Sequence, residues 1–297
     1  MLLAGEAAPL STAAIAKSIG ANRSLVSRVL SELQSRRLVE RVPGKTYELG
    51  PRILELGAAY AATQGFGQSV HATLNEVAHA TAQTTNLAIL VDLDVLYLMK
   101  HEGRDSVIGV SQVGSRLPAS CTAVGKALLS CLEDGDIERR YASVTDLPRL
   151  TPHSVGTLGD LLRDVRATRD RGYAIERDET AVGRTCLAMA VSWHGVPCNR
   201  AALGVSMANA TYDDDAGTIL PRLQMAAARL EKEAAARLVL EGPSDPSRTY
   251  GERSNGQGER SNGQGHREGP AGRGDRIGAP APTRAAGRRA GDGRSSG

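Results

Sequence analysis

Long apolar segments are missing from this chain of 297 residues. No stretch approaches the roughly 20 apolar residues that a membrane-spanning helix needs, and the amino end has no basic segment followed by an apolar run and a cleavage site. These absences argue against a membrane protein and against a secreted one. We therefore expect no membrane partner and a cytoplasmic location.

Cysteine is also scarce. The four cysteines have spacings typical of neither a zinc site nor a disulfide framework: Cys121, Cys131, Cys186 and Cys198. We interpret them as reduced thiols, mostly buried. His194 and Cys198 form a metal-like pair, but the glycine and proline between them favour a turn. The sequence therefore predicts no metal site and no cofactor.

Familiar catalytic motifs are absent as well. The chain has no Gly-x-Ser-x-Gly segment of the kind that presents a nucleophilic serine. The segment Gly125-Lys126-Ala127 lacks both the hydroxyl and the upstream glycine of a phosphate-binding loop. We predict no catalytic residue and no enzyme activity. A small-molecule enzyme stays open as an alternative that substrate turnover would reveal.

What the sequence does contain, between Leu10 and Leu49, is the pattern of two helices followed by a hairpin. Residues 11–19 predict a first helix that Ser11 or Thr12 caps and Gly20 ends. Asn22 caps a second helix over about 23–36. Four apolar residues of that helix recur at helical spacing toward a core: Val26, Val29, Leu30 and Leu33.

The outer face of the second helix carries hydroxyl and guanidinium groups: Arg23, Ser24, Ser27, Arg28 and Ser31. Hydroxyls donate to phosphates or base edges, and arginine pairs bidentately with guanine. Residues 38–42 and 46–49 read as two strands with Lys45 at the turn between them. The order helix, turn, helix, basic hairpin predicts a winged helix-turn-helix that binds double-stranded DNA. The competing interpretation is an amphipathic helical pair with a solvated charged face.

The charge distribution favours DNA as the partner. Residues 1–52 hold eight Lys or Arg against four Glu, and residues 243–297 hold ten Arg against six acids. The whole chain is only +3, so the segment between these ends is net negative. The basic charge is therefore concentrated at the two ends.

Four segments resemble the IclR family of bacterial transcriptional regulators. They are Ser-Leu-Val-Ser-Arg-Val-Leu (24–30), Tyr-Glu-Leu-Gly-Pro-Arg-Ile-Leu-Glu-Leu-Gly (47–57), Cys-Thr-Ala-Val-Gly-Lys-Ala-Leu (121–128) and Gly-Tyr-Ala (172–174). Together they cover about residues 8–240. The resemblance implies a ligand-responsive regulator of catabolic genes that binds a palindromic operator as a dimer or dimer of dimers.

The resemblance implies an α+β chain in four parts. They are a winged helix-turn-helix (1–50), a linker helix that pairs protomers (51–67), a GAF-like α/β effector-binding domain (68–242) and a tail (243–297). The family has a full helix before the helix that Ser11 caps, of which only residues 1–4 remain here, so either the true start lies upstream or the domain lacks part of its core. This departure leaves open an effector-binding sensor that has lost operator binding.

The spacing of apolar residues changes inside the effector-binding part, from helical to strand-like. We expect strands over 87–91, 95–99, 107–113, 173–177, 186–193 and 201–207. Helices are expected over 70–82, 121–132, 158–171 and 213–240, the last disturbed at Pro221. Mixed strands and helices indicate an α+β sensor.

The family's ligand pocket, carried over by motif, predicts an effector site for a small organic acid. The expected residues are Cys121, Thr122, Ala123, Val124, Glu176, Cys186, Gly204 and Ser206. Free amides at residues 121–124 with the Thr122 hydroxyl would hold a carboxylate. The family often has Asp where Glu176 stands and a hydroxyl where Gly204 stands, so we expect a ligand larger or less hydrogen-bonded than a small keto acid. The competing interpretation makes Cys186 a core thiol and Ser206 a satisfied strand residue.

The last 55 residues differ from the rest in composition. Gly, Pro, Ser and Arg dominate from residue 243, and Gly-Glu-Arg-Ser-Asn-Gly-Gln occurs twice, at 251–257 and 258–264. Such a segment does not bury enough apolar surface to offset chain entropy. We predict a disordered tail there.

Overall fold

The computed structural model describes residues 3, 9–106, 111–194 and 196–241. The predicted tail from residue 243 lies outside the described residues, and so do residues 1–2 and 4–8. In the described part, no helix combines the length and apolar character needed to cross a membrane.

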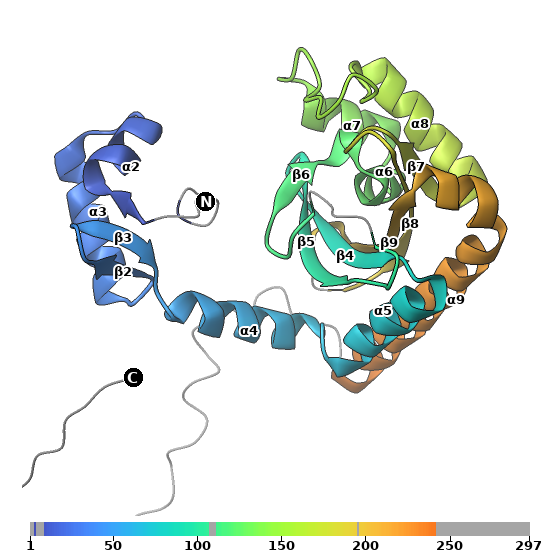
Figure 1. Ribbon diagram of the computed structural model, residues 1–297, viewed down its shortest axis with the longest axis horizontal. Coiled ribbons are helices and arrows are strands. Elements are labelled where there is room, and N and C mark those ends of the chain that lie inside the picture. Colours follow the sequence, from blue (N-terminus) through green and yellow to red (C-terminus); the bar gives the residue numbers. More distant parts are fainter. Residues whose placement is uncertain (1–2, 4–8, 107–110, 195, 242–297) are drawn as a thin grey trace, which may run out of the picture. The chain divides into compact units, whose positions relative to one another are not determined.

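The amino-terminal unit consists of two helices and a small sheet (Figure 1). Its elements are β1 (Leu10–Ser11), α2 (Thr12–Ser18), α3 (Arg23–Ser35), β2 (Val39–Val42) and β3 (Thr46–Leu49). The strands pair antiparallel in the order β1-β3-β2. This arrangement confirms the expected helix-turn-helix with a wing.

The predicted caps start both helices. The Ser11 hydroxyl accepts a hydrogen bond from the amide of Ala14 at 3.2 Å. The Asn22 side-chain oxygen accepts one from the amide of Ser24 at 2.8 Å. Each cap satisfies an amide that has no partner inside its helix.

A small apolar core holds this unit together. Its buried members come from α2, α3, β2 and β3: Ile15, Ala16, Val26, Leu30, Val39 and Tyr47. The prediction that Val29 joins this core is wrong, because its side chain is 49% exposed. At 100° per residue, Val29 lies roughly 80° from the middle of the face that Val26 and Leu30 define.

Helix α4 (Arg52–Gln64) follows the wing and buries none of its own residues. Several of its apolar side chains remain in solvent, with Leu54 78% and Leu56 50% exposed, whereas Tyr60 and Ala61 are partly buried against the core of the following domain. The helix ends at Gly65, which adopts the left-handed conformation common at helix ends.

The following domain is built on a six-stranded antiparallel sheet in the order β6-β5-β4-β9-β8-β7. The strands are β4 (Thr84–Val91), β5 (Asp94–His101), β6 (Arg116–Pro118), β7 (Ala174–Arg177), β8 (Arg184–Ser192) and β9 (Arg200–Ala208). Strands β4 and β9, which are far apart in the sequence, pair in the middle of the sheet.

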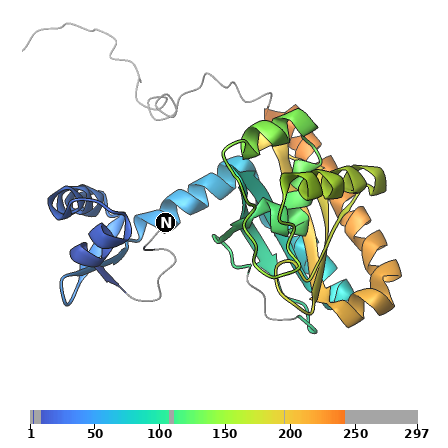
Figure 2. The same cartoon turned by 90° about the horizontal axis from the view of Figure 1, so that it is seen from above.

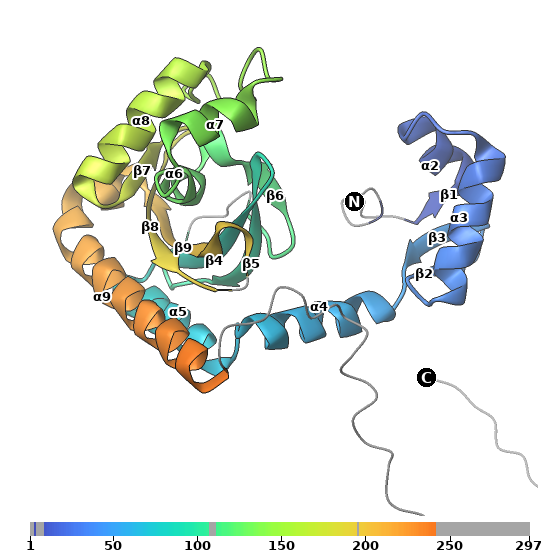
Figure 3. The ribbon, with the colours of Figure 1, turned by 180° about the vertical axis from the view of Figure 1, so that it is seen from behind.

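Helices cover both faces of this sheet (Figure 2). One face packs against α5 (Gln68–Thr81) and α9 (Asn209–Glu241), which lie side by side (Figures 1 and 3). The other face packs against α6 (Ala123–Leu129), α7 (Asp134–Tyr141) and α8 (Leu158–Arg171). Two short 3-10 helices complete the domain, η1 (Ala119–Cys121) and η2 (Pro197–Asn199). The α+β class is therefore confirmed.

Two predicted elements differ from the structure. Residues 107–110 of the expected strand lie outside the described residues, and residues 111–113 are not in a strand. A turn at Gln112–Ser115 precedes β6, which instead pairs with β5. The expected helix over 121–132 is shorter, since α6 begins at Ala123 and ends at Leu129. Helix α7 was not predicted.

Candidate ligand pocket and nucleic-acid interface

The outer face of α3 is open to solvent. All five residues predicted to contact DNA from this helix are exposed: Arg23, Ser24, Ser27, Arg28 and Ser31. Lys45, at the turn of the wing, is exposed too. The hydroxyl of Ser24 donates to the Asn22 side-chain oxygen at 2.7 Å, so it takes part in the cap. The α3 face thus presents basic and hydroxyl groups above a buried apolar side.

A pocket lies in the second domain between the start of α6 and the sheet. The cavity itself is small, about 20 Å³, and the concavity around it holds about 310 Å³ of space not filled by atoms, which includes open solvent. Its lining comes from strands, helix and loops: Asn86, Tyr97, Ser111, Leu117, Thr122, Ala123, Val124, Glu176, Thr180, Arg184, Cys186, Leu187, Gly204 and Ser206. This mixture of apolar walls and a few polar groups is typical of small-molecule sites.

The strand register places the polar lining residues in two rows. Cys186 on β8 lies opposite both Glu176 on β7 and Ser206 on β9. In the next row on the same face, Gly204 on β9 lies opposite Asn86 on β4. Neighbouring positions on that face are alanines, which are short and leave room beneath α6: Ala88, Ala174, Ala188 and Ala202.

The structure brings seven of the eight predicted effector residues to this pocket: Thr122, Ala123, Val124, Glu176, Cys186, Gly204 and Ser206. Cys121 lies behind the lining. It is fully buried in η1, and its thiol donates to the carbonyl of Pro148 at 3.0 Å. The expected anion seat therefore lacks Cys121.

Thr122 serves first as the cap of α6. Its hydroxyl accepts a hydrogen bond from the amide of Gly125 at 3.0 Å. A Cβ atom at Gly125 would lie 2.2 Å from the carbonyl oxygen of Ala119, so only glycine allows this close turn. Because the hydroxyl oxygen only accepts in this bond, its hydrogen is left to donate to a ligand carboxylate.

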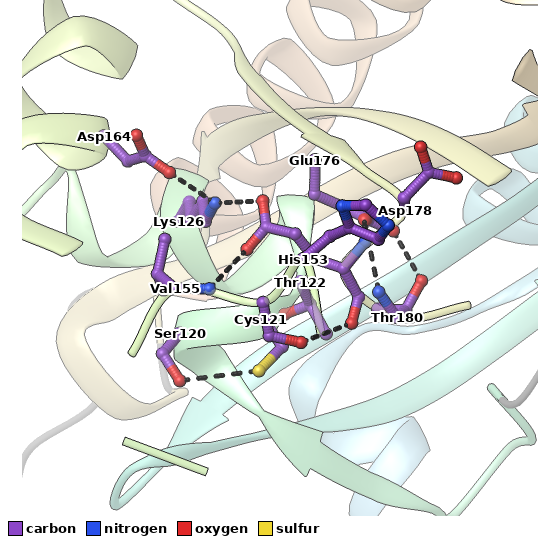
Figure 4. Close-up of polar contacts among 12 residues, drawn as sticks. Ser120, Cys121, Thr122, Lys126, His153, Val155, Asp164, Glu176, Asp178 and Thr180 are labelled. Carbon is purple, nitrogen blue, oxygen red and sulfur yellow. Dashed lines mark hydrogen bonds and ion pairs between the residues drawn. The ribbon is translucent and has the colours of Figure 1, made fainter. Parts of the chain in front are cut away.

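Glu176 is held by its own loop. Its carboxylate accepts hydrogen bonds from the amides of Glu179 and Thr180 at 2.9 and 3.3 Å, and from the Thr180 hydroxyl at 2.5 Å (Figure 4). Three donors from this turn occupy most of its acceptor capacity. Glu176 therefore shapes the pocket wall.

Cys186 and Ser206 form a polar pair on the floor of the pocket, with sulfur and oxygen 3.0 Å apart. Burial raises the pKa of the Cys186 thiol, and the nearby Glu176 carboxylate adds to this rise. The thiol therefore stays neutral at physiological pH and offers a ligand a weak hydrogen-bonding group.

A buried ion cluster supports the wall from behind. The ammonium of Lys126, wholly buried, lies 2.6 Å from Asp164 and 2.5 Å from Glu179 (Figure 4). Burial raises the pKa of Glu179, although Lys126 acts in the opposite direction. Because Glu179 also donates its amide to Glu176, the cluster connects α6 and α8 to the pocket wall.

Sequence reasoning missed several lining residues, Arg184, Tyr97 and Asn86 among them. Arg184, 5% exposed, stands two positions before Cys186 on β8 and so shares its face. That alternation could have identified it. Tyr97 and Asn86 lie on other strands, and only the pairing register brings them to the same pocket.

Comparisons with known proteins match both parts of the chain. A family model for the carboxy-terminal domain of bacterial transcriptional regulator IclR matches residues 58–232, and one for the IclR helix-turn-helix domain matches residues 1–43. HTH-type transcriptional regulator XynR of Escherichia coli strain K12 is 30% identical over 211 residues, which span 70% of this chain and 82% of that protein.

Solved structures show the same fold. An IclR transcriptional regulator from Alicyclobacillus acidocaldarius aligns with a TM-score of 0.64 at 24% identity, over 75% of this chain and 89% of that one. An IclR homolog from Microbacterium hydrocarbonoxydans, complexed with 4-hydroxybenzoate, aligns with a TM-score of 0.63 at 22% identity, over 78% and 94%.

The two family matches, their order along the chain and the shared fold lead to one conclusion. This chain belongs to the IclR family of transcriptional regulators, with the family's helix-turn-helix at its amino end followed by the effector-binding domain.

Proposed function

We propose that this chain binds a palindromic operator through α3 and the wing, and that a small organic acid in the pocket controls this binding. The observation that carries the proposal is the exposed basic and hydroxyl face of α3 in a chain that also holds a lined pocket. Arg28 reads base edges from the middle of that face. Lys45 contacts the phosphate backbone.

The acid is proposed because the pocket holds a buried cation. Arg184 lines the pocket and is only 5% exposed. A guanidinium pairs strongly with a carboxylate in a site with little water. The 4-hydroxybenzoate in the Microbacterium hydrocarbonoxydans homolog is an acid of this kind.

We propose self-association through α4. Its exposed apolar residues, Ile53, Leu54 and Leu56, form a surface that pairing with a second copy would bury. Two copies would present two α3 helices to half-sites about one helical turn apart, roughly 34 Å. A dimer or a dimer of dimers satisfies this geometry.

Two hydrogen bonds connect the effector-binding domain to the end of α4. The carbonyl of Gln64, at the end of α4, accepts hydrogen bonds from the Trp193 ring nitrogen at 2.8 Å and from Arg237 at 2.7 Å. Trp193 directly follows β8, the strand that lines the pocket with Arg184 and Cys186. We propose that ligand binding shifts β8 and, through Trp193, the end of α4.

A gel-shift titration with DNA flanking the coding region tests the proposal. Arg28→Ala should weaken operator binding about tenfold or more, since a bidentate arginine contact is worth roughly 1–3 kcal/mol. Arg104→Ala, which removes an exposed arginine from the effector-binding domain, is the matched control. Equal affinity of both variants and the parent protein would refute the role of α3.

The same titration with added carboxylic acids tests the control step. A bound effector should change operator affinity by about 5- to 150-fold, the range of typical allosteric coupling. The fluorescence of Trp193, the single tryptophan of the chain, reports binding without DNA. Fluorescence changes with no operator binding would instead identify a sensor that has lost DNA recognition.

A further inference from the structure

The strongest unused feature of the pocket is the side chain of Asn86. It lies on β4, the central strand, in a residue only 3% exposed, and it lines the pocket. Within the described part of the chain, its side-chain oxygen is buried and accepts no hydrogen bond. A buried polar atom without a partner costs stability, so its retention calls for a reason.

Gly204 makes room for this amide. The two residues lie opposite each other in the β4·β9 register. A Cβ atom at position 204 would come within 2.6 Å of the Asn86 oxygen and 2.9 Å of a methyl carbon of Val124. Asn86 and any side chain at 204 therefore exclude each other. In the row of Gly204, the polar group therefore comes from Asn86 on β4 and not from β9.

We propose that Asn86 selects the effector, by requiring a ligand hydroxyl that donates a hydrogen bond to its side-chain oxygen. This inference rests on the proposed function of the pocket and narrows its ligand to hydroxylated carboxylic acids.

In this proposal, Arg184 binds the carboxylate at the other end of the ligand. Arg184 lies opposite Ala208 on β9, and Asn86 lies opposite Gly204. Their rows are four residues apart, which is roughly 13 Å along the strands. Both side chains line the pocket. A carboxylate bound at Arg184 therefore leaves the far end of the ligand beside Asn86.

Matched acid pairs provide the test. The probes are 4-hydroxybenzoate with benzoate and 6-hydroxyhexanoate with hexanoate, whose hydroxyls lie far from the carboxylate, each titrated into the full chain by Trp193 fluorescence and calorimetry. The parent protein should bind the hydroxylated member of its preferred pair about ten- to a hundredfold more tightly, because the other member leaves the buried oxygen without a partner.

Asn86→Val should abolish this preference by weakening the hydroxylated acid alone. Thr84→Val is the matched control. Thr84 is also buried on β4 with an unpartnered hydroxyl, two residues away, but it does not line the pocket. The control should keep the preference.

A parent protein without any hydroxyl preference overturns the inference, whether or not Asn86→Val folds. So does an Asn86→Val variant that keeps the preference. Operator binding measured on the same samples separates the two proposals. Loss of the hydroxyl preference with intact operator binding defeats only this inference, whereas a retained preference without operator binding defeats the proposed function.

Discussion

Single residues determine how much space the pocket offers. Gly204 and Asn86 share one volume, and Gly125 allows α6 to begin close to Ala119. Cys186 and Ser206 stay close together on the floor as neutral groups. At Gly204 and at Gly125, an added methyl group would lie closer to neighbouring atoms than van der Waals contact allows.

Gly204→Ser should destabilise the effector-binding domain by about 1–3 kcal/mol, the usual cost of overpacking. The new Cβ atom would overlap the Asn86 amide and Val124. Adding Asn86→Ala should recover part of this loss by removing the nearer overlap. Thermal unfolding of the parent, the two single variants and the double variant measures the coupling. Purely additive shifts would show that the two side chains do not compete for space.

The motif around Cys121 shows what sequence reasoning reaches at this scale. Seven of the eight residues carried over by resemblance line one pocket, because the family motif fixes their positions on α6 and the strands. Cys121 does not, since the chain turns through η1 before α6 begins. Asn86 was missed because its importance depends on a partner strand 118 residues further along the chain at Gly204.

At the scale of elements, the ion cluster on α6 holds the pocket wall in place. Lys126 extends from α6 to Asp164 on α8 and to Glu179 in the turn after β7. In that turn, the amide of Glu179 donates a hydrogen bond to the carboxylate of Glu176, and the carbonyl of Glu179 accepts one from the Ser154 hydroxyl. Two helices and a loop therefore meet at one buried ammonium.

Lys126→Met should lower the free energy of unfolding by about 3 kcal/mol, because it leaves the buried carboxylate of Glu179 without its counter-charge. Chemical denaturation monitored by circular dichroism measures the loss. Lys100→Met is a matched control, since Lys100 pairs with Glu102, which is 67% exposed. A loss no larger than that of the control would contradict the supporting role of the cluster.

Element boundaries followed the sequence wherever local signals agreed. Helix α8 has the Thr157 cap, Asp160 in its first turn and the left-handed Gly172 after its end, and it spans the predicted residues. The hairpin of β2 and β3 also matches its prediction. In the expected strand at 107–113, by contrast, residues 111–113 are not in a strand. The pairing of β6 with β5 depends on contacts between distant residues, which no local sequence signal encodes.

For the whole molecule, the exposed apolar surface of α4 is the feature on which the proposed self-association depends. Leu54, 78% exposed, is its most accessible large apolar residue. In a monomer this side chain would stay in water, whereas pairing of two α4 helices would bury it.

Leu54→Glu should therefore shift the protein from dimer to monomer, since burying an unpaired carboxylate at a helix interface is costly. Size-exclusion chromatography with light scattering measures the mass. Val182→Glu is the matched control, because Val182 is 70% exposed in the loop between β7 and β8. Operator affinity should fall with the dimer. An unchanged mass for Leu54→Glu would place the assembly surface elsewhere.

The double hydrogen bond on the Gln64 carbonyl has a mechanical consequence. It fixes one end of a helix of 13 residues whose own side chains are not buried. Such a helix is about 20 Å long, so a tilt of about 10° at the fixed end sweeps the opposite end through about 3 Å. A ligand-driven tilt of this size, as we propose, would therefore displace the amino end of α4 by about the rise of one base pair.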